Sequence, residues 1–266
     1  MSDEKNGEYV EALARGLAVI EAFDEETPEM TLTELARKID MSPATVRRNL
    51  HTLEALCFVR RNHKHFLLAP RILTLGSAYL KAVRVDEAIM PELHRITELF
   101  GDAANVAVLD GTNVLYIAHL SETRAARRMA SIGVTYPAYA TSMGRVLLAH
   151  LSPEELDSYF SKAELRKLTD MTVTDEKALR AILAEVRVNG YSITIDQLDY
   201  GITALAVPIR DSVGKVVAAV NTSGYSPRLK PQDLLEQRLA EMRIAAARVS
   251  NLLLRYPALL HSLATH

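Results

Sequence analysis

Residues 31–54, TLTELARKIDMSPATVRRNLHTLE, constrain the fold of this 266-residue chain most strongly, because they predict two helices joined by a tight turn. Thr31 and Glu34 have the spacing of a capping box, in which each side chain bonds a free backbone N–H at a helix start. Ser42 is a favoured N-cap residue, and Pro43 follows at the first helical position, where no N–H is needed. The second helix is therefore predicted to begin at this serine.

The second of these helices has two different faces. Val46, Leu50 and Leu53 recur at helical spacing and predict a buried stripe, while small, basic and hydrogen-bonding residues lie roughly opposite. A helix that enters the DNA major groove needs small residues for close approach and arginines for guanine edges and phosphates. The residues predicted to contact DNA from this helix are Ser42, Ala44, Thr45, Arg47, Arg48 and His51. A helical hairpin with a solvated basic face is the alternative that these residues leave open.

A basic segment follows the two helices. Residues 57–68 predict two short strands around a basic tip, the shape of a wing. Residues 41–71 carry six positive charges and one negative charge, a local net of +5, whereas the whole chain has a net charge of −2. A basic island in a slightly acidic protein is typical of phosphate binding. We expect Arg60, Arg61 and Lys64 on the wing, and Arg15 on a preceding helix, to reach DNA.

Composition limits the class of protein. Hydrophobic residues make up 48% of the chain and charged residues 24%, as in ordinary soluble globular proteins. The polar start MSDEKNGEY predicts no signal peptide, and no apolar run approaches the roughly 20 residues that span a bilayer. The single cysteine, Cys57, excludes an intrachain disulfide framework and fits a reducing cytoplasm. Its apolar neighbours predict that it is a small buried core residue.

Apolar periodicity predicts the remaining helices and strands. Val10, Leu13, Leu17 and Ile20 predict the buried stripe of a first helix over residues 9–23, and Ile72, Leu75, Tyr79 and Val83 that of a linker helix over 71–84. Further on, we expect helices over 86–100, 141–151 and 175–189, another from Ser152 and a final long one from Pro231. Strands are expected over 104–109, 114–119, 127–133, 191–196, 203–210 and 215–223. The fold class is therefore α+β, with helices flanking an antiparallel sheet.

Three stretches carry a resemblance to a known family. LARGLAVIEAF with the helical pair and wing, PAYATSMGRVLLAHL, and GITALAVPIRDSVGKVVAAVNTSGYSPR resemble the IclR family of bacterial transcriptional regulators, over about residues 9–255. The second stretch is most similar to the branch that regulates the β-ketoadipate pathway, the PcaR, PcaU and PobR types. The resemblance implies a winged helix-turn-helix DNA-binding domain over residues 1–70, a linker helix over 71–85 and a GAF-like effector-binding domain over 86–266. It also implies double-stranded operator DNA as a partner and a homo-oligomer, a dimer or a tetramer.

The second domain is predicted to bind a ligand rather than to catalyse a reaction. We find no nucleophile elbow, P-loop, zinc-protease motif or Rossmann glycine run, so we expect no catalytic residue, no metal and no cofactor. Free N–H groups at a helix start favour an anion, which makes Ser142, Met143 and Gly144 candidate effector contacts. The family resemblance adds Thr194, Ile202, Ala204, Asn221 and Ser223 as residues that face the effector cavity. A capped helix start without a ligand is the alternative.

The expected effector is a small organic acid, aromatic or from the β-ketoadipate pathway. A carboxylate would suit a guanidinium, for which Arg127, Arg128 and Arg145 are candidates, with Arg128 preferred. Two other functions stay open at this point: an enzyme with an appended DNA-binding module, and a nucleotide-binding GAF signalling protein.

Overall fold

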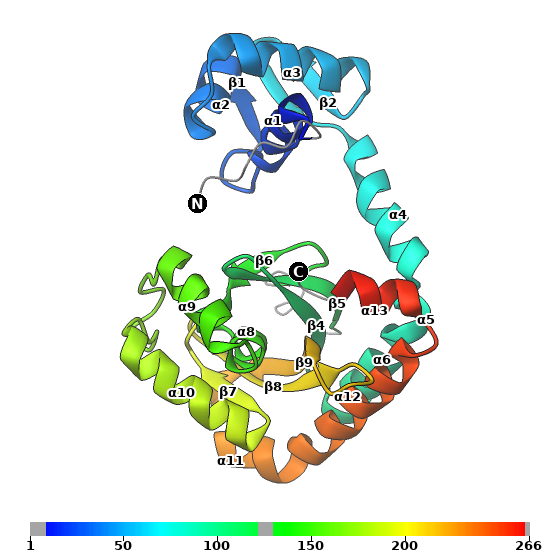
Figure 1. Cartoon of the computed structure of the whole chain (residues 1–266), viewed down its shortest axis with the longest axis vertical. Helices are drawn as coiled ribbons and strands as arrows, with labels where there is room; N and C mark the ends of the chain where they lie inside the picture. Colours follow the sequence, from blue (N-terminus) through cyan, green and yellow to red (C-terminus); the bar gives the residue numbers. More distant parts are fainter. Residues whose placement is uncertain (1–8, 122–129, 264–266) are drawn as a thin grey trace. The chain divides into compact units, whose positions relative to one another are not determined.

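The computed structural model describes residues 9–121 and 130–263, which fall into two units, residues 1–79 and 80–266 (Figure 1). The first unit contains helices and a small sheet. Its elements are α1 (Glu11–Glu21), β1 (Glu29–Thr31), α2 (Leu32–Lys38), α3 (Pro43–Ala55), β2 (Val59–Asn62) and β3 (His65–Leu68), and α4 (Leu73–Val83) follows. The three strands form an antiparallel sheet in the order β1-β3-β2. This is the winged helix-turn-helix arrangement that the sequence predicts.

The caps of α2 and α3 are those that the sequence predicts. The Thr31 side chain accepts from the Glu34 backbone N–H, and the Glu34 carboxylate accepts from the Thr31 backbone N–H at 2.8 Å. Ser42 caps α3 by accepting from the Thr45 N–H at 3.2 Å, and Pro43 occupies the first position. The apolar faces of α1, α2 and α3 meet in one core with residues of the wing. Local capping therefore fixes where both helices of the motif begin.

Three predictions for the first unit were wrong. Glu29–Thr31 forms an edge strand on the wing, whereas the sequence predicted only a helix start at Thr31 and no strand there. Cys57 is exposed, because its backbone lies in the left-handed region (φ 62°) where the chain turns from α3 into the wing. Three apolar residues predicted to be buried on α1 are 47–64% exposed, since the buried residue of that helix is Val19. Those three are Val10, Leu13 and Leu17.

The second unit is built around one six-stranded antiparallel sheet. Its strands are β4 (Ala103–Asp110), β5 (Asn113–Leu120), β6 (Thr135–Pro137), β7 (Ser192–Ile195), β8 (Ile202–Arg210) and β9 (Val216–Tyr225), in the order β6-β5-β4-β9-β8-β7. Its helices of four residues or more are α5 (Val85–Ala88), α6 (Met90–Phe100), α8 (Ser142–Ala149), α9 (Pro153–Lys162), α10 (Glu176–Asn189), a π-helical turn (Leu234–Arg238), α12 (Leu239–Leu253) and α13 (Pro257–Leu263). The predicted α+β class, with helices flanking an antiparallel sheet, is confirmed.

Helices cover both faces of this sheet. α8 packs on one face over small residues of three strands, Ala107, Ala206 and Ala219, and these methyl groups let the helix approach closely. α6 and α12 pack against strands of the same sheet, and Figure 1 shows them away from α8. α10 packs on α8 and ends at Gly190, whose positive φ of 70° suits a glycine C-cap. The small residues of the sheet therefore set how deeply α8 sits on it.

Two expectations for the second unit were also wrong. The third strand is β6 at Thr135–Pro137, whereas the predicted strand over 127–133 lies partly outside the described residues and its remainder is not a strand. The long helices are interrupted: a break separates α5 from α6, and the π-helical turn precedes α12. One extra residue in that turn changes which side chain faces the core: Leu234 is fully buried, whereas Leu235 is half-buried.

Candidate functional site

The exposed face of α3 carries two arginines. Arg47 and Arg48 are both exposed, and within the described residues neither side chain has a hydrogen-bond or ion-pair partner. On the opposite face Val46, Leu50 and Leu53 are at most 7% exposed and belong to the core of the first unit. The helix is thus anchored by one side and presents two unpaired cations on the other. This is the surface that a DNA-reading helix needs.

The other residues predicted on α3 surround these arginines. Ala44 and His51 are exposed, and Thr45 is half-buried at the first turn. The Ser42 hydroxyl is occupied as the helix cap and lies 2.9 Å from the Thr45 hydroxyl. Ser42 is itself exposed, so its hydroxyl can still meet a phosphate at the helix N-terminus.

The wing supplies further exposed cations. Arg60, Arg61 and Lys64 are exposed around the β2–β3 tip. Arg61 donates from Nε to the His63 carbonyl at 2.8 Å, and its guanidinium lies 5.5 Å from the ring centre of Phe66. These contacts fix one cation beside the turn. Arg15 on α1 instead pairs with Glu11 at 2.6 Å, a half-exposed ion pair of the kind that contributes little stability.

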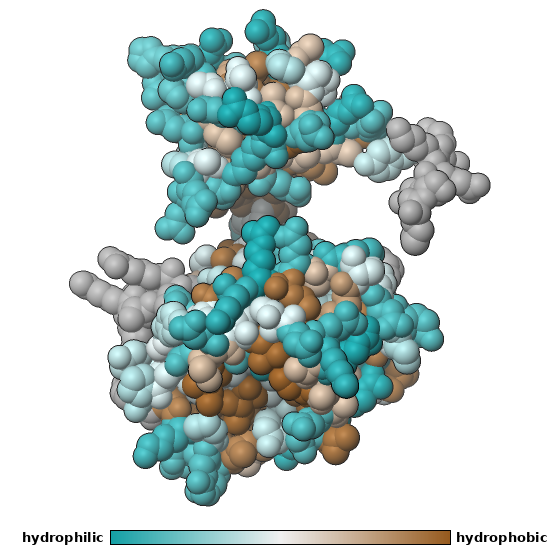
Figure 2. Space-filling view, turned by 90° about the vertical axis from the view of Figure 1, so that its left-hand side faces the viewer, coloured by the Kyte–Doolittle hydropathy of each residue, from teal (hydrophilic) through white to brown (hydrophobic). Residues whose placement is uncertain are grey.

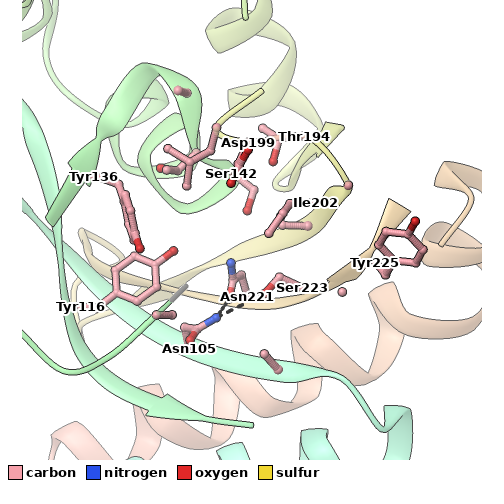
Figure 3. Close-up of a pocket in the computed structure, with 18 of the residues that line it drawn as sticks. Asn105, Tyr116, Tyr136, Ser142, Thr194, Asp199, Ile202, Asn221, Ser223 and Tyr225 are labelled. Atoms are coloured by element: carbon pink, nitrogen blue, oxygen red, sulfur yellow. Dashed lines mark hydrogen bonds between the residues drawn. The ribbon is translucent and has the colours of Figure 1, made fainter. Parts of the chain in front are cut away.

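The second unit contains a cavity of about 890 Å³ beside the N-terminus of α8. Its walls are mostly apolar, with polar groups at a few positions, as in small-molecule sites. Among the residues predicted to face the effector, the lining includes Ser142, Thr194, Ile202, Ala204, Asn221 and Ser223 (Figure 3). The structure thus brings together side chains from one helix and three strands, β7, β8 and β9.

The start of α8 leaves one polar atom without a partner. Thr141 caps the helix by accepting from the Gly144 N–H at 3.0 Å. Ser142, the next residue, lines the cavity, and its buried hydroxyl has no hydrogen-bond partner among the described residues. A buried hydroxyl normally has a partner, since leaving it unpaired costs about 1–3 kcal/mol. At a helix N-terminus an anionic or acceptor group of a ligand would supply it.

Three residues near this helix start differ from the sequence prediction. Met143 is fully buried in the core rather than at the cavity wall. Gly144 is required by packing, because a Cβ there would lie 2.1 Å from the Ala138 carbonyl oxygen. The buried Arg145 guanidinium donates to the Tyr139 carbonyl at 2.8 Å and to Gln197 Oε1 at 2.6 Å, so it is committed to the fold. Burial lowers the pKa of Arg145 to about 10.

A row of polar side chains crosses three neighbouring strands at the cavity. His119, Asn105 and Asn221 lie directly opposite one another on β5, β4 and β9. His119 Nδ1 lies 2.6 Å from Asn105 Oδ1, and Asn105 Nδ2 donates to Asn221 Oδ1 at 2.7 Å. The asparagines are at most 3% exposed. The sheet register, rather than any local motif, therefore assembles this row.

Two tyrosines form another part of the cavity wall. Tyr116 and Tyr136 pack edge to face with their ring centres 5.4 Å apart (Figure 3). Burial raises the pKa of Tyr116, so its phenol stays neutral at ordinary pH. Neither tyrosine nor Asn105 was predicted as a site residue. The only available signal was a lone polar residue, Asn105, in the apolar predicted strand over 104–109.

Cationic side chains are missing from the described part of the cavity wall. No arginine or lysine lines the cavity among residues 9–121 and 130–263. Arg127 and the preferred candidate Arg128 lie outside the described residues. Within the described part, donors to a carboxylate are therefore neutral: hydroxyl, amide and phenol groups together with the start of α8.

In the same part of the chain, no helix has the length and apolar content to cross a membrane.

Family comparisons agree with this geometry. Residues 12–63 match the model of the IclR helix-turn-helix domain, and residues 77–251 match that of the bacterial transcriptional regulator IclR C-terminal domain. The chain belongs to the IclR family of bacterial transcriptional regulators. Its IclR helix-turn-helix match contains α3, and its IclR C-terminal match contains the cavity.

Individual IclR-family relatives match over most of this regulator. The Pca regulon regulatory protein of Pseudomonas putida is 38% identical over 242 residues, 91% of this chain and 83% of the relative. The p-hydroxybenzoate hydroxylase transcriptional activator of Acinetobacter baylyi is 30% identical over 250 residues, 92% of each chain. An IclR homologue from Microbacterium hydrocarbonoxydans, solved with 4-hydroxybenzoate, has a TM-score of 0.74 at 27% identity and covers 90% of this chain and 98% of its own.

Proposed function

We propose that this regulator reads an operator with α3 and grips the DNA backbone with its wing. Arg47 and Arg48 would reach base edges or phosphates in the major groove, helped by the small Ala44 and by His51. Ser42 and Thr45 would contact phosphate at the helix start, and Arg60, Arg61, Lys64 and Arg15 would contact the flanking backbone. The single observation that carries this proposal is the pair of exposed arginines opposite the buried face of α3, which have no partner within residues 9–121 and 130–263.

The ligand that fits the second unit best is a small aromatic or β-ketoadipate-pathway acid. Ser142, Asn221 and Ser223 supply polar groups, while Ile202, Ala204 and the two cavity tyrosines supply apolar and aromatic surface. Thr194 adds another hydroxyl, and Arg128 stays a candidate partner for the carboxylate. The similar Microbacterium protein was solved with 4-hydroxybenzoate, and the names of two relatives concern Pca and p-hydroxybenzoate regulation. Met143 and Gly144 support the site from the core.

Homo-oligomerisation is part of the proposal. Leu13 and Leu17 on α1, with Tyr9 and Val10 just before it, are 47–64% exposed. On α4, Leu73 and Leu75 are 71% and 50% exposed. Such apolar stripes are typical of helices that pair with another chain. A second copy on these helices gives a dimer whose recognition helices are spaced by about 34 Å, or a multiple, on a partly palindromic site. Pairs of dimers would give a tetramer.

The proposed domains follow from these roles. Residues 1–70 would read DNA, residues 71–85 would link, and residues 86–266 would bind the effector. The relatives named above are transcriptional regulators, and we propose that this chain likewise acts without turnover of its ligand, in the cytoplasm. A ligand recovered unchanged after prolonged incubation would agree with this.

Selection of DNA sites from a random duplex pool tests the proposed DNA binding. The full-length chain should enrich a partly palindromic motif, because two identical α3 helices would contact it. The failure to enrich any motif, with the chain folded, would contradict the proposal. A sequence enriched equally by a chain lacking the wing arginines (Arg60→Ala with Arg61→Ala) would contradict the assigned wing contacts.

A further inference from the structure

Each hydrogen bond along the polar row of the cavity has a defined direction. An asparagine side chain accepts only at Oδ1 and donates only at Nδ2. Asn105 turns its Oδ1 to His119 Nδ1 at 2.6 Å, so this imidazole nitrogen must carry a proton and donate. Asn105 must then give its Nδ2 to the other side of the row, where it reaches Asn221 Oδ1 at 2.7 Å.

The same constraint passes to the last member of the row. Because Asn221 turns its Oδ1 to Asn105, its amide NH₂ faces the cavity, and Figure 3 shows that nitrogen directed into the space below Ser142 and Ile202. Ser223 Oγ lies 3.5 Å from Asn105 Nδ2 as an acceptor, which leaves its O–H free to donate. The cavity floor thus offers two donors from these residues, the Asn221 NH₂ and the Ser223 hydroxyl.

If the hydrogen bonds of the row ran in the opposite direction, Asn221 would present an acceptor to the cavity instead of a donor. If His119 Nδ1 lacked a proton, it could only accept, and Asn105 would have to turn its Nδ2 toward the histidine. Asn105 Oδ1 would then accept from Asn221 Nδ2, and Asn221 Oδ1 would face the cavity. A neutral imidazole carries one proton on one of its two nitrogens, so the position of that proton selects between the two arrangements.

We propose that His119 determines the ligand specificity of this cavity, by fixing the Asn221 amide so that its NH₂ faces the ligand. This inference rests on the effector role proposed above and adds which chemical group the floor selects. A carboxylate only accepts, so both donors suit it, and charge strengthens such bonds. A carboxamide of the same shape brings an NH₂ that would face a donor, so the floor disfavours it.

Long-range proton–nitrogen NMR on histidine-labelled, full-length protein tests the first step without a ligand. We expect the His119 signals to show a protonated Nδ1, identified by their loss in a His119→Asn variant. A spectrum in which only Nε2 carries a proton would overturn the proposal, because the row would then run the other way.

Calorimetric titration with 4-hydroxybenzoate and its isostere 4-hydroxybenzamide tests the consequence. Wild type should prefer the acid, and His119→Leu should reduce this preference about tenfold, the effect of losing one charge-assisted hydrogen bond. His119→Asn is the matched control, because its amide can still donate from the position of Nδ1 and should preserve most of the preference. The ratio of the acid and amide affinities reports the hydrogen-bond direction alone, because a general loss of packing would weaken the binding of both compounds equally.

Three results would contradict the proposal. An unchanged acid-to-amide ratio in His119→Leu would show that the histidine does not orient the floor. Equal losses in the asparagine and leucine variants would show that donation is not what matters. Wild type that binds neither compound would contradict a hydroxybenzoate-type effector, on which the proposal is built, whereas the first two results leave that effector class intact.

Discussion

At the scale of single residues, two nearby positions at the N-terminus of α8 have different roles, one in packing and one at the cavity. Gly144 and Ser142 lie two positions apart. The glycine accommodates the Ala138 backbone, whereas the serine lines the cavity and its hydroxyl has no partner in the described part of the chain. The sequence predicted that both would contact a ligand. Residue type and position at the helix start could not distinguish the two roles, because the close approach of Ala138 depends on the tertiary path of the chain.

Gly144→Ala should lower the free energy of unfolding by about 1–3 kcal/mol, because the new methyl group would overlap a backbone carbonyl that cannot rotate away. Urea denaturation of the full chain measures this. Gly76→Ala on α4 is the control: nothing lies within 4 Å of its Cβ, and alanine should stabilise that helix by up to about 1 kcal/mol. Equal effects of the two substitutions would contradict the packing role.

At the scale of secondary-structure elements, capping residues predicted well where helices begin. Apolar periodicity predicted the interiors of helices less well. The starts of α2, α3, α9 and α10 all carry the predicted side-chain caps. The π-helical turn before α12 interrupts the long helix that was predicted from Pro231, and no residue of the turn predicts it. β1 was missed for a related reason, since a three-residue edge strand is stabilised by its partner β3 and not by its own pattern.

α1 gives a prediction at this scale. Its periodicity correctly indicated an apolar stripe, but Leu13 and Leu17 are 64% and 47% exposed rather than buried within one chain. If a second copy covers the stripe, Leu13→Glu should convert dimers to monomers in sedimentation velocity, because a buried unpaired charge is costly. Val188→Glu, on an 87% exposed residue of α10, should leave the mass unchanged. A dimer that survives Leu13→Glu would contradict this interface.

At the scale of the whole molecule, sequence predicted the two functions better than the details of the cavity. Helix periodicity and local charge identified α3, because those signals lie within about 25 residues. The polar row of His119, Asn105 and Asn221 comes from strands far apart in the chain, so only the sheet register reveals it. The site residues that were expected on strands came from family resemblance rather than from pattern.

Linkage between the two sites gives a prediction for the complete chain. If 4-hydroxybenzoate changes operator affinity by some factor, saturating operator must change the affinity for 4-hydroxybenzoate by the same factor. The same ligand at 100 times its dissociation constant should stabilise the chain by about 2.7 kcal/mol. A Ser142→Ala, Ser223→Ala double variant should lose most of this stabilisation in a thermal melt. A double variant with an unchanged melt shift would contradict the assigned cavity contacts.

The central claim is that the exposed arginines of α3 read DNA, and fluorescence anisotropy on the selected operator tests it most directly. Arg47→Ala or Arg48→Ala should weaken specific binding by about 1–3 kcal/mol, roughly fivefold to 150-fold, if the side chain contacts a base. Lys177→Ala, an equal loss of charge at an exposed position on α10, should have little effect. Two arginine variants that bind this operator as tightly as wild type would contradict the account.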